Sequence, residues 1–362
     1  RISRIVVDEA HLCHMWGNFR DCMKDIGSNR PTHRQGNVRR FVPLVALTGT
    51  CPGFLQANIM RHLNIAGPNL VIVDQPTRNT TTKFVSELFH NSNSLHKDGA
   101  TPWIDFVCSQ VLSNIDNSIP NRAIFYVTKR ADAKIYTAYA ISKYPALHPQ
   151  EFTGDLDSRT KASLYMSWQD RKVNVLFCTT AFGLGVDDPT CTLVVRIGLG
   201  RSTMGVIQES GRCGRAGGKS MSITLVDQHE SLRDSSQILE KADNVTRKDF
   251  ERLPPGFLGH EACLGATLAD FLELPVASSL PCLIHPNIDQ WTYCTVCELG
   301  GPLRDRSTKY NLRESNFAAA KDALTGGNSA DLAQHSGDNT ASEYSVGQPI
   351  VLTSTTKRHR SA

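Results

Sequence analysis

Long apolar runs are missing from this sequence. No stretch approaches the roughly 18 apolar residues that a membrane-spanning helix needs, and no charged-then-apolar signal segment opens the chain. An excess of one charge is also missing, because 39 Lys and Arg against 35 Asp and Glu leave a net charge of only +4. These absences argue against membrane and secreted proteins. They also exclude a histone-like basic binder, although a local basic groove stays compatible with them.

What is present fits a folded protein of more than one domain. The 362 residues leave room for two or three domains, and an apolar share of 40% with a charged share of 20% is enough for a core. Eleven cysteines, mostly without paired spacing, suit a reducing compartment better than a disulfide framework. The chain begins at Arg1 and runs straight into an apolar strand, so we expect it to be a fragment.

Short apolar runs without polar alternation recur along the chain and are separated by helical stretches. This pattern predicts an α/β fold with parallel sheets covered on both faces, in two successive units. We expect strands at 2–7, 41–47 and 70–73 in the first unit and at 123–127, 173–178, 193–197 and 221–226 in the second, with helices at 54–63, 131–144 and 203–209.

Composition shifts divide the chain further. Residues 75–82 are polar and contain a proline, so we place a linker there and divide the units into 1–75 and 76–228. Residues 229–300 are first polar and helical and then rich in cysteine. Residues 301–362 contain mainly Ser, Thr, Asn, Gly and Ala without periodicity, so we expect a disordered tail.

Two adjacent carboxylates, Asp8 and Glu9, follow the first apolar run. The carboxyl edge of a parallel sheet is where ligands bind, so a pair placed there can hold Mg²⁺ and polarise a water that attacks a phosphoryl group. The alternative is an acidic pair that merely caps the next helix. The pair alone does not decide between the two.

Residues 182–187 (Phe-Gly-Leu-Gly-Val-Asp) come shortly after the strand expected at 173–178. The glycines, Gly185 among them, allow a tight turn and close backbone approach to a phosphate or ribose, and Asp187 can accept a ribose hydroxyl. An ordinary glycine-rich turn is the alternative interpretation.

The segment 208–218 contains Arg212 and Arg215, each preceded by glycine, at the expected end of a helix. Guanidinium groups on one face there can meet the charge that develops in phosphoryl transfer. A solvated basic turn is the alternative. Gly218-Lys219-Ser220 is similar to the end of a phosphate-binding loop, but Cys213 replaces the required earlier glycine and a strand follows, so we reject it.

In this order, the segments resemble the motifs of superfamily 2 helicases, and specifically of the RecQ family of ATP-dependent DNA helicases. The resemblance runs from residue 1 to about residue 228. Residues 8–11 resemble motif II, 13–20 the aromatic-rich loop that follows it, 46–50 motif III, 78–79 the stretch between lobes, 125–127 motif IV, 181–189 motif V and 208–217 motif VI.

The resemblance implies two RecA-like parallel-sheet lobes, the first incomplete (1–75) and the second complete (76–228), followed by a helical, zinc-binding subdomain. It also implies that ATP and Mg²⁺ bind between the lobes. By resemblance, Asp8 would bind Mg²⁺, Glu9 would activate water, Gly185 and Asp187 would contact the nucleotide, Arg212 would assist at the γ-phosphate, Arg215 would be the arginine finger, and His11 and Gln208 would relay the nucleotide state.

The same resemblance implies that Trp16, Phe19 and Arg20 touch single-stranded DNA, since aromatic faces stack on bases and Arg pairs with phosphate. Core packing is the alternative for Trp16. The sequence also departs from the family. No adenine-reading glutamine or phosphate-binding loop precedes Asp8 within these residues, so the triphosphate lacks its cradle. The aromatic loop is one residue short, and Gly49 and Cys213 each replace the usual alanine.

Cys294 and Cys297 form a C-x-x-C pair, with Cys263 and Cys282 upstream. Four thiolates suit a tetrahedral structural Zn²⁺ site, and members of the RecQ family carry a zinc subdomain at this place. The spacing between Cys282 and Cys294 is longer than usual in the family, and His285 is a substitute ligand. The alternative is a set of unpaired thiols.

The resemblance therefore predicts an ATP-dependent 3′-to-5′ DNA helicase acting on single-stranded DNA and duplex junctions in repair or recombination in the nucleus. We expect little ATPase activity from this chain alone. A non-catalytic nucleic-acid-binding helicase remnant is the main alternative, and an RNA helicase of the wider superfamily is a third hypothesis.

Overall fold

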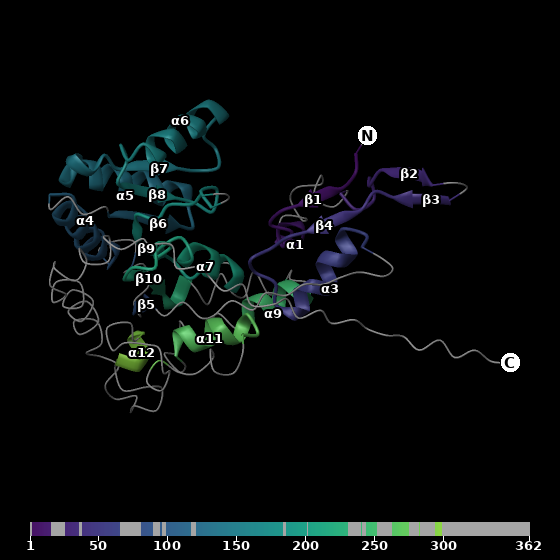
Figure 1. The fold of residues 1–362 in the computed structure, drawn as a ribbon. Coiled ribbons are helices and arrows are strands. Elements are labelled where there is room, and N and C mark those ends of the chain that lie inside the picture. Colours follow the sequence, from purple (N-terminus) through teal and green to yellow (C-terminus); the bar gives the residue numbers. More distant parts are fainter. Residues whose placement is uncertain are drawn as a thin grey trace, which may run out of the picture. The chain divides into compact units, whose positions relative to one another are not determined.

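The computed structural model separates the chain into two units, with the division between Thr77 and Arg78. The described residues are 2–15, 26–35, 38–65, 81–89, 95, 99–116, 121–183, 186–200, 202–230, 240, 244–251, 263–274, 282 and 294–298. Each unit contains its own sheets (Figure 1). The tail predicted at 301–362 and the strand predicted at 70–73 lie outside these residues.

The first unit contains two small sheets. Strand β1 (Ile5–Val7) pairs in parallel with β4 (Leu44–Ala46), and β2 (Thr32–Gln35) forms an antiparallel hairpin with β3 (Val38–Phe41). The one strand predicted over 41–47 is wrong. The chain leaves the hairpin after Phe41 and enters the parallel pair only at Leu44, because Pro43 between them has no N–H for a ladder. Helices α1 (Leu12–Met15) and α3 (Gly53–His62) complete this unit.

One face of the β1–β4 pair is apolar and open to solvent. Val6 stands opposite Val45 in the register, and the two residues are 54% and 39% exposed. Ile2 and Leu47 are also exposed. Parallel strands are normally covered on both faces. The described residues leave one face of this pair uncovered, so the pair buries little apolar surface.

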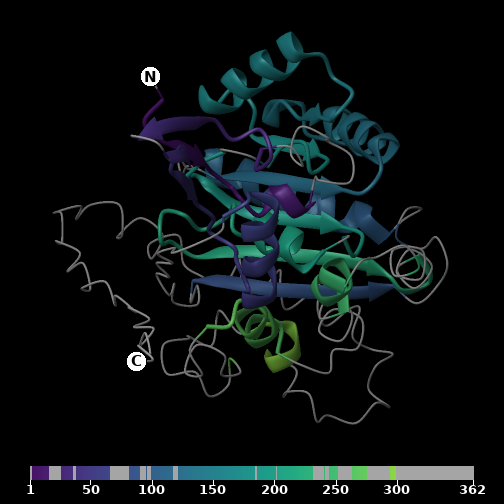
Figure 2. The same cartoon turned by 90° about the vertical axis from the view of Figure 1, so that its right-hand side faces the viewer.

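A six-stranded sheet forms the centre of the second unit, in the order β5-β10-β9-β6-β8-β7, and every pairing in it is parallel (Figures 1 and 2). The strands are β5 (Thr82–Phe89), β6 (Arg122–Val127), β7 (Gln150–Phe152), β8 (Val175–Cys178), β9 (Cys191–Ile197) and β10 (Ser220–Asp227). The parallel α/β fold predicted for this unit is confirmed.

Helices cover both faces of this sheet. Helices α4 (Ala100–Asp116) and α5 (Arg130–Lys143) pack on one face with the buried side chains of Trp103, Ala133 and Phe177. The opposite face carries α7 (Thr203–Ser210), and Trp168 of α6 (Ser158–Gln169) belongs to the core on this side (Figure 1). A short 3₁₀ helix, η2 (Pro145–Leu147), leads into β7.

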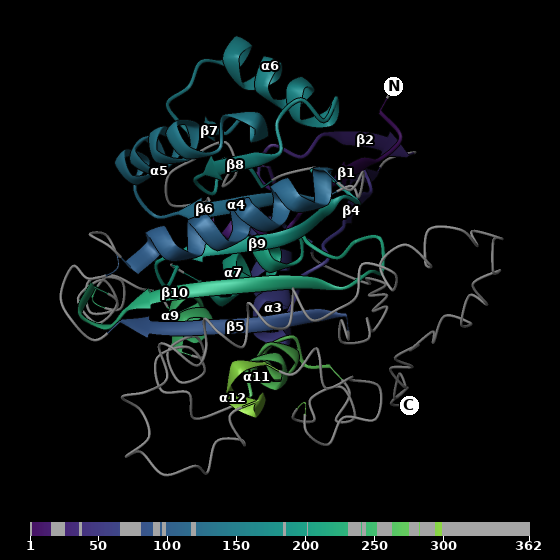
Figure 3. The same cartoon turned by 90° about the vertical axis from the view of Figure 1, so that its left-hand side faces the viewer.

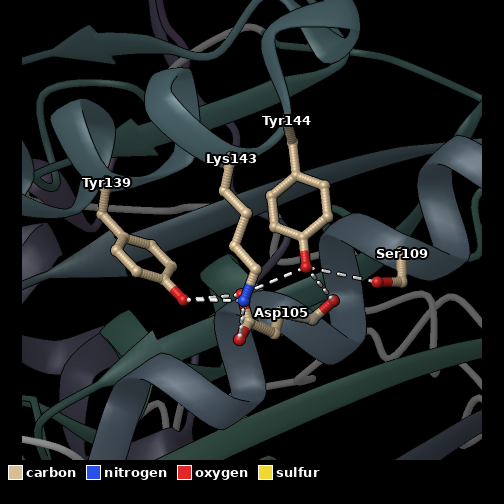
Figure 4. Close-up of polar contacts among 5 residues, drawn as sticks. All are labelled: Asp105, Ser109, Tyr139, Lys143 and Tyr144. Carbon is tan, nitrogen blue, oxygen red and sulfur yellow. Dashed lines mark hydrogen bonds and ion pairs between the residues drawn. The ribbon is translucent and has the colours of Figure 1, made fainter.

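A polar cluster joins α4 to the end of α5 (Figure 4). Asp105 of α4 accepts hydrogen bonds from Lys143 Nζ at 2.6 Å and from the Tyr139 hydroxyl at 2.8 Å, and the Tyr144 hydroxyl lies 3.3 Å from Ser109 Oγ. Hydrogen bonding to Asp105, with a second bond to Tyr139, raises the pKa of Lys143. Because α4 and α5 meet here at the protein surface, the cluster fixes their relative position.

The region after β10 packs against the far end of the sheet. Helices α9 (Asn244–Glu251), α11 (Leu264–Phe271) and α12 (Thr295–Glu298) are described there, and α11 and α12 lie beyond the edge strand β5 (Figure 3). Phe250, Leu264 and Val296 share one buried cluster with Val206 of α7 and Val226 of β10. Among the described helices, none has the length and apolar composition that crossing a membrane would require.

Candidate functional site

The acidic pair predicted from the sequence lies directly after β1. Asp8 is exposed and Glu9 half-buried, and the backbone N–H of Glu9 donates to Asp8 Oδ1 at 2.9 Å. Glu9 has a φ of 49°, in the left-handed region that a residue other than glycine rarely occupies. Such backbone strain is concentrated at functional sites. The position and conformation of the pair therefore fit a ligand site better than a simple helix cap.

His11 connects this pair to the next predicted motif. The side chain is fully buried, with Nδ1 2.8 Å from Thr48 Oγ1 and 3.4 Å from Glu9 Oε2. The Thr48 hydroxyl in turn donates to the Thr50 carbonyl at 3.1 Å. The imidazole thus lies between Glu9 and Thr48, which belongs to the segment after β4.

In the second unit, Arg215 and Asp187 form an ion pair. Arg215 Nη1 donates to Asp187 Oδ1 at 2.8 Å, and Arg215 Nε donates to the Gly211 carbonyl at 3.1 Å. The Asp187 side chain is 78% exposed. Two residues that the sequence assigned to the nucleotide are therefore neighbours on one surface. Gly185 lies outside the described residues.

Arg212 differs from Arg215, and the prediction that both lie on one helix face is wrong. Helix α7 ends at Ser210, so both arginines lie in the turns after it. Arg212 is buried and Nη1 donates to the Val186 carbonyl at 2.7 Å. Gly214, between the two arginines, has a φ of 73°, in the left-handed region that glycine adopts without strain. Gln208, half-buried, remains on α7.

The segment that carries Asp187 is fastened to the sheet at several points. The Tyr126 hydroxyl donates to the Phe182 carbonyl at 2.9 Å, and burial raises the pKa of that tyrosine, which keeps it a donor. Asp188 pairs with Arg122, the first residue of β6, and Arg122 lies 4.2 Å over the Trp168 ring. These contacts hold the predicted motif V segment along β6, from Tyr126 near the carboxyl end of the strand to Arg122 at its start.

A second set of candidate residues, which the sequence analysis missed, lies at the carboxyl edge of the sheet. Thr128, Thr153 and Thr179 follow β6, β7 and β8, and the carboxyl ends of parallel strands meet at one edge. Helix α5 begins beside Thr128 with no side-chain cap, which leaves its first N–H groups for a ligand. The recurrence of threonine after each strand was a signal in the sequence, but β7 has only three residues and escaped notice.

The three residues predicted to contact DNA, Trp16, Phe19 and Arg20, lie outside the described residues, as does His285. The structure therefore leaves both assignments as predictions.

The four predicted zinc ligands come together. Cys263, Cys282, Cys294 and Cys297 are buried, and their Sγ atoms all lie within 4.8 Å of one another. Cys263 Sγ is 3.4 Å from Cys282 Sγ and 3.7 Å from Cys294 Sγ. Bonds of 2.3 Å to a tetrahedral zinc would place sulfurs about 3.8 Å apart, so the cluster fits this ion. Hydrogen bonds from Cys282, Cys294 and Cys297 lower the pKa of Cys263, which favours the thiolate that a metal needs.

Comparison with protein families and curated proteins shows which proteins this chain is similar to. The helicase conserved C-terminal domain matches residues 105–217, from α4 through the turn after Arg215. RecQ-like DNA helicase blm-1 of Caenorhabditis elegans is 26% identical over 247 residues, covering 68% of this chain and 23% of that protein. ATP-dependent helicase SGS1 of Saccharomyces cerevisiae is 25% identical, covering 70% of this chain and 16% of that protein. The chain is similar to RecQ-family helicases of superfamily 2.

A bacterial protein and a solved structure are also similar to this chain. ATP-dependent DNA helicase RecQ of Pasteurella multocida is 26% identical, covering 59% of this chain and 30% of that protein. The chain thus spans about a sixth to a third of the length of the curated relatives named here. Among solved structures, Saccharomyces cerevisiae Dbp5 bound to RNA and ADP BeF3 matches with a TM-score of 0.50 at 17% identity, covering 66% of this chain and 56% of that one. This likeness supports the helicase fold.

Proposed function

We propose that this chain contributes to an ATP-dependent DNA helicase that couples ATP hydrolysis to 3′-to-5′ unwinding in DNA repair or recombination in the nucleus. The observation that carries the proposal is the second unit, where Arg212, Arg215 and Asp187 occupy one loop cluster on a parallel sheet. Guanidinium groups beside an acid at such a place suit the charge of a nucleotide.

In this proposal the nucleotide-side roles follow the sequence prediction, except that buried Arg212 supports the loop instead of assisting at the γ-phosphate. Asp8 offers the carboxylate oxygens that Mg²⁺ prefers, and Glu9, whose backbone lies in the left-handed region, would act on a water. Arg215, on the surface and held only by exposed partners, is free to turn toward a γ-phosphate, whereas Arg212 stabilises the loop from beneath. His11 and Gln208 would report the nucleotide state.

Nucleic acid is proposed to bind at the carboxyl edge of the second sheet. Thr128 and Thr179, both half-buried, can donate hydroxyl groups to phosphates, and exposed Arg130 adds a positive charge beside the start of α5. Thr153 is buried and its hydroxyl donates to Asp155 Oδ1, so it supports this edge from within. Trp16, Phe19 and Arg20 would add stacking and a further cation. Such contacts are to the backbone, so binding should be independent of sequence and should weaken as salt rises.

The four cysteines are proposed to hold one Zn²⁺. Bound there, the ion would supply a structural crosslink between α11 and the later segments. The domain boundaries 1–75, 76–228, 229–300 and 301–362 are proposed on the same basis as the motifs.

These 362 residues contain no phosphate-binding loop with its lysine, so we propose that the chain alone hydrolyses ATP slowly at most. The test compares wild type with Glu9→Gln in DNA binding over a salt series and in DNA-stimulated ATPase. Salt-dependent DNA binding that is equal in both proteins, with no hydrolysis in either, favours the second candidate, a non-catalytic nucleic-acid-binding module. Hydrolysis in wild type that Glu9→Gln abolishes supports the motor and overturns the expectation of an inactive chain. Absence of DNA binding in both overturns both functions.

A further inference from the structure

The start of α7 is held by a residue that no predicted motif contains. Asp249 of α9 is only 4% exposed, and its Oδ1 accepts a hydrogen bond from the Met204 N–H at 3.1 Å. The Thr203 hydroxyl donates to the Asp249 backbone carbonyl. The first N–H groups of a helix have no partners within the helix, so Asp249 supplies one from 45 residues further along the chain.

The other end of α7 leads directly to the arginines. Glu209 pairs with buried Arg196 of β9, and the chain then turns so that Arg212 reaches the Val186 carbonyl. Helix α7 has eight residues, a length of about 12 Å. A helix this short moves as one piece, so a shift at Met204 is carried to the turns that follow Ser210.

Apolar packing reinforces the contact. Phe250, next to Asp249, is 1% exposed and belongs to the same buried cluster as Val206 of α7, Leu268 of α11 and the four clustered cysteines. Helix α7 therefore has the sheet on one side and the α9–α11 region on the other. The region after β10 covers α7 and adds a hydrogen bond at its start, beside the one that the Ser202 hydroxyl accepts from the Gly205 N–H at 2.9 Å.

We propose that α9 holds α7 in place through Asp249 and Phe250, an arrangement that we call the clasp. We further propose that Asp249 is a positioning residue that sets the place of Arg212 and Arg215. The clasp itself is independent of the reaction. Its importance for nucleotide chemistry rests on the proposed function of those arginines.

The test is amide hydrogen exchange of the full chain, read by mass spectrometry. In Asp249→Ala, amides of residues 204–211 should exchange roughly tenfold faster, as expected when a helix loses a capping side chain. Those of α5 should not change. In Asp249→Asn the exchange should return to near the wild-type rate, because the amide oxygen still accepts from Met204. This rescue distinguishes a specific hydrogen bond from general packing.

A matched control comes from the same unit. Asp157 caps α6 by accepting from the N–H groups of Arg159 at 2.9 Å and Thr160 at 3.0 Å. Asp157→Ala should therefore accelerate exchange at the start of α6 and leave α7 unchanged. Faster exchange in α7 from this distant cap would contradict a local clasp.

Three results would overturn the proposal: unchanged exchange of α7 in Asp249→Ala, no rescue by Asn, or equal acceleration across the whole sheet. If Asp249→Ala does not fold, Thr203→Val removes the hydroxyl that donates to the Asp249 carbonyl and decides in its place. Faster exchange of α7 in that variant supports the clasp, and unchanged exchange rejects it. Nucleotide binding by wild type, measured in parallel, separates the two proposals. If wild type binds no nucleotide, the role assigned to the arginines is wrong, but the exchange result still tests the contact between α9 and α7.

Discussion

Arg215 donates a hydrogen bond to Asp187 over 2.8 Å, so the two residues assigned to opposite ends of a nucleotide are bonded to each other. The pair is open to solvent, with side-chain exposures of 34% and 78%. Exposed ion pairs stabilise little, typically by less than about 1 kcal/mol. The pair can therefore separate at small cost when a nucleotide competes for either partner.

This exposure leads to a contrast between the two arginines. Arg215→Ala should change the free energy of unfolding by less than about 1 kcal/mol. Arg212→Ala should lower it by about 2 kcal/mol, because a buried charged hydrogen bond to the Val186 carbonyl is lost. Urea denaturation of the full chain measures both. A larger loss in Arg215→Ala than in Arg212→Ala would contradict the assignment of Arg215 to the surface site and Arg212 to the loop support.

Alanine substitutions at two glycines near the predicted motifs should have different effects on the stability of the protein. A Cβ at Gly49 would meet nothing within 4 Å among the described residues. Since the family usually has alanine here, Gly49→Ala should leave stability unchanged or raise it by up to about 1 kcal/mol.

Gly200 is the matched opposite. It has a φ of 82°, and a Cβ there would lie 2.6 Å from Arg196 Nε, the residue that pairs with Glu209 of α7. The backbone conformation alone should cost Gly200→Ala about 1–3 kcal/mol, before the guanidinium is displaced. Thermal denaturation of the two variants side by side gives the comparison, and equal midpoints would show that the Arg196 pair adapts freely.

The open face of the β1–β4 pair predicts that the first unit is the less stable one. Two short parallel strands with Val6 and Val45 exposed bury too little apolar surface for independent stability, whereas the six-stranded sheet is covered on both faces. Limited proteolysis of the full chain should therefore cut within residues 1–65 before it cuts within 121–227. Cleavage in the reverse order would show that the first unit is better protected than its described packing suggests.

The sequence pattern predicted the parallel fold because buried strands such as 123–127 and 193–197 are continuous apolar runs, and these correspond to β6 and β9. Strand β5 was missed because Lys83, Ser86 and Glu87 interrupt its apolar character. All three are nevertheless buried, and Glu87 accepts a hydrogen bond from the Trp103 indole. The Trp103 indole, 16 residues away, satisfies the buried Glu87 carboxylate, and no local sequence pattern can reveal such a partner.

For the candidate site, the sequence predicted the motif residues but not the residues that support them. Motif spacing located Asp187 and Arg215, but it did not reveal that Asp188, the next residue, is buried against Arg122. Nor did it reveal Asp249, since its role depends on α9 folding back onto α7. Residue type at a fixed spacing identifies the groups that carry chemistry. The groups that hold them are distant in sequence and become visible only in the fold.

The four clustered thiols lead to a metal prediction. The purified chain should contain about one zinc ion, and Cys297→Ser should lose it, since a structural site needs all four ligands. Chelation should lower the melting temperature, because the same buried cluster includes Val206 and Phe250. Cys51→Ser is the control, because that cysteine is exposed and lies in the first unit. Elemental analysis without zinc in wild type would reject the site.

Asp249 gives the pH dependence a definite sign. Burial raises its pKa from 3.8 to about 6, against the opposing effect of the hydrogen bonds around Met204 and Thr203. The folded state therefore binds this proton more tightly than the unfolded state, and the ionised carboxylate costs stability at neutral pH. The cost, up to about 3 kcal/mol, is present above pH 6 and disappears as the pH falls toward 4. Asp249→Asn, which cannot ionise, should be more stable than wild type at pH 7, and the difference should shrink steadily down to about pH 4. Denaturation of both proteins across this range measures the difference. A gap that stays constant on acidification would show that Asp249 titrates as an ordinary exposed acid, and a gap that grows would show that folding lowers its pKa; either result contradicts the prediction.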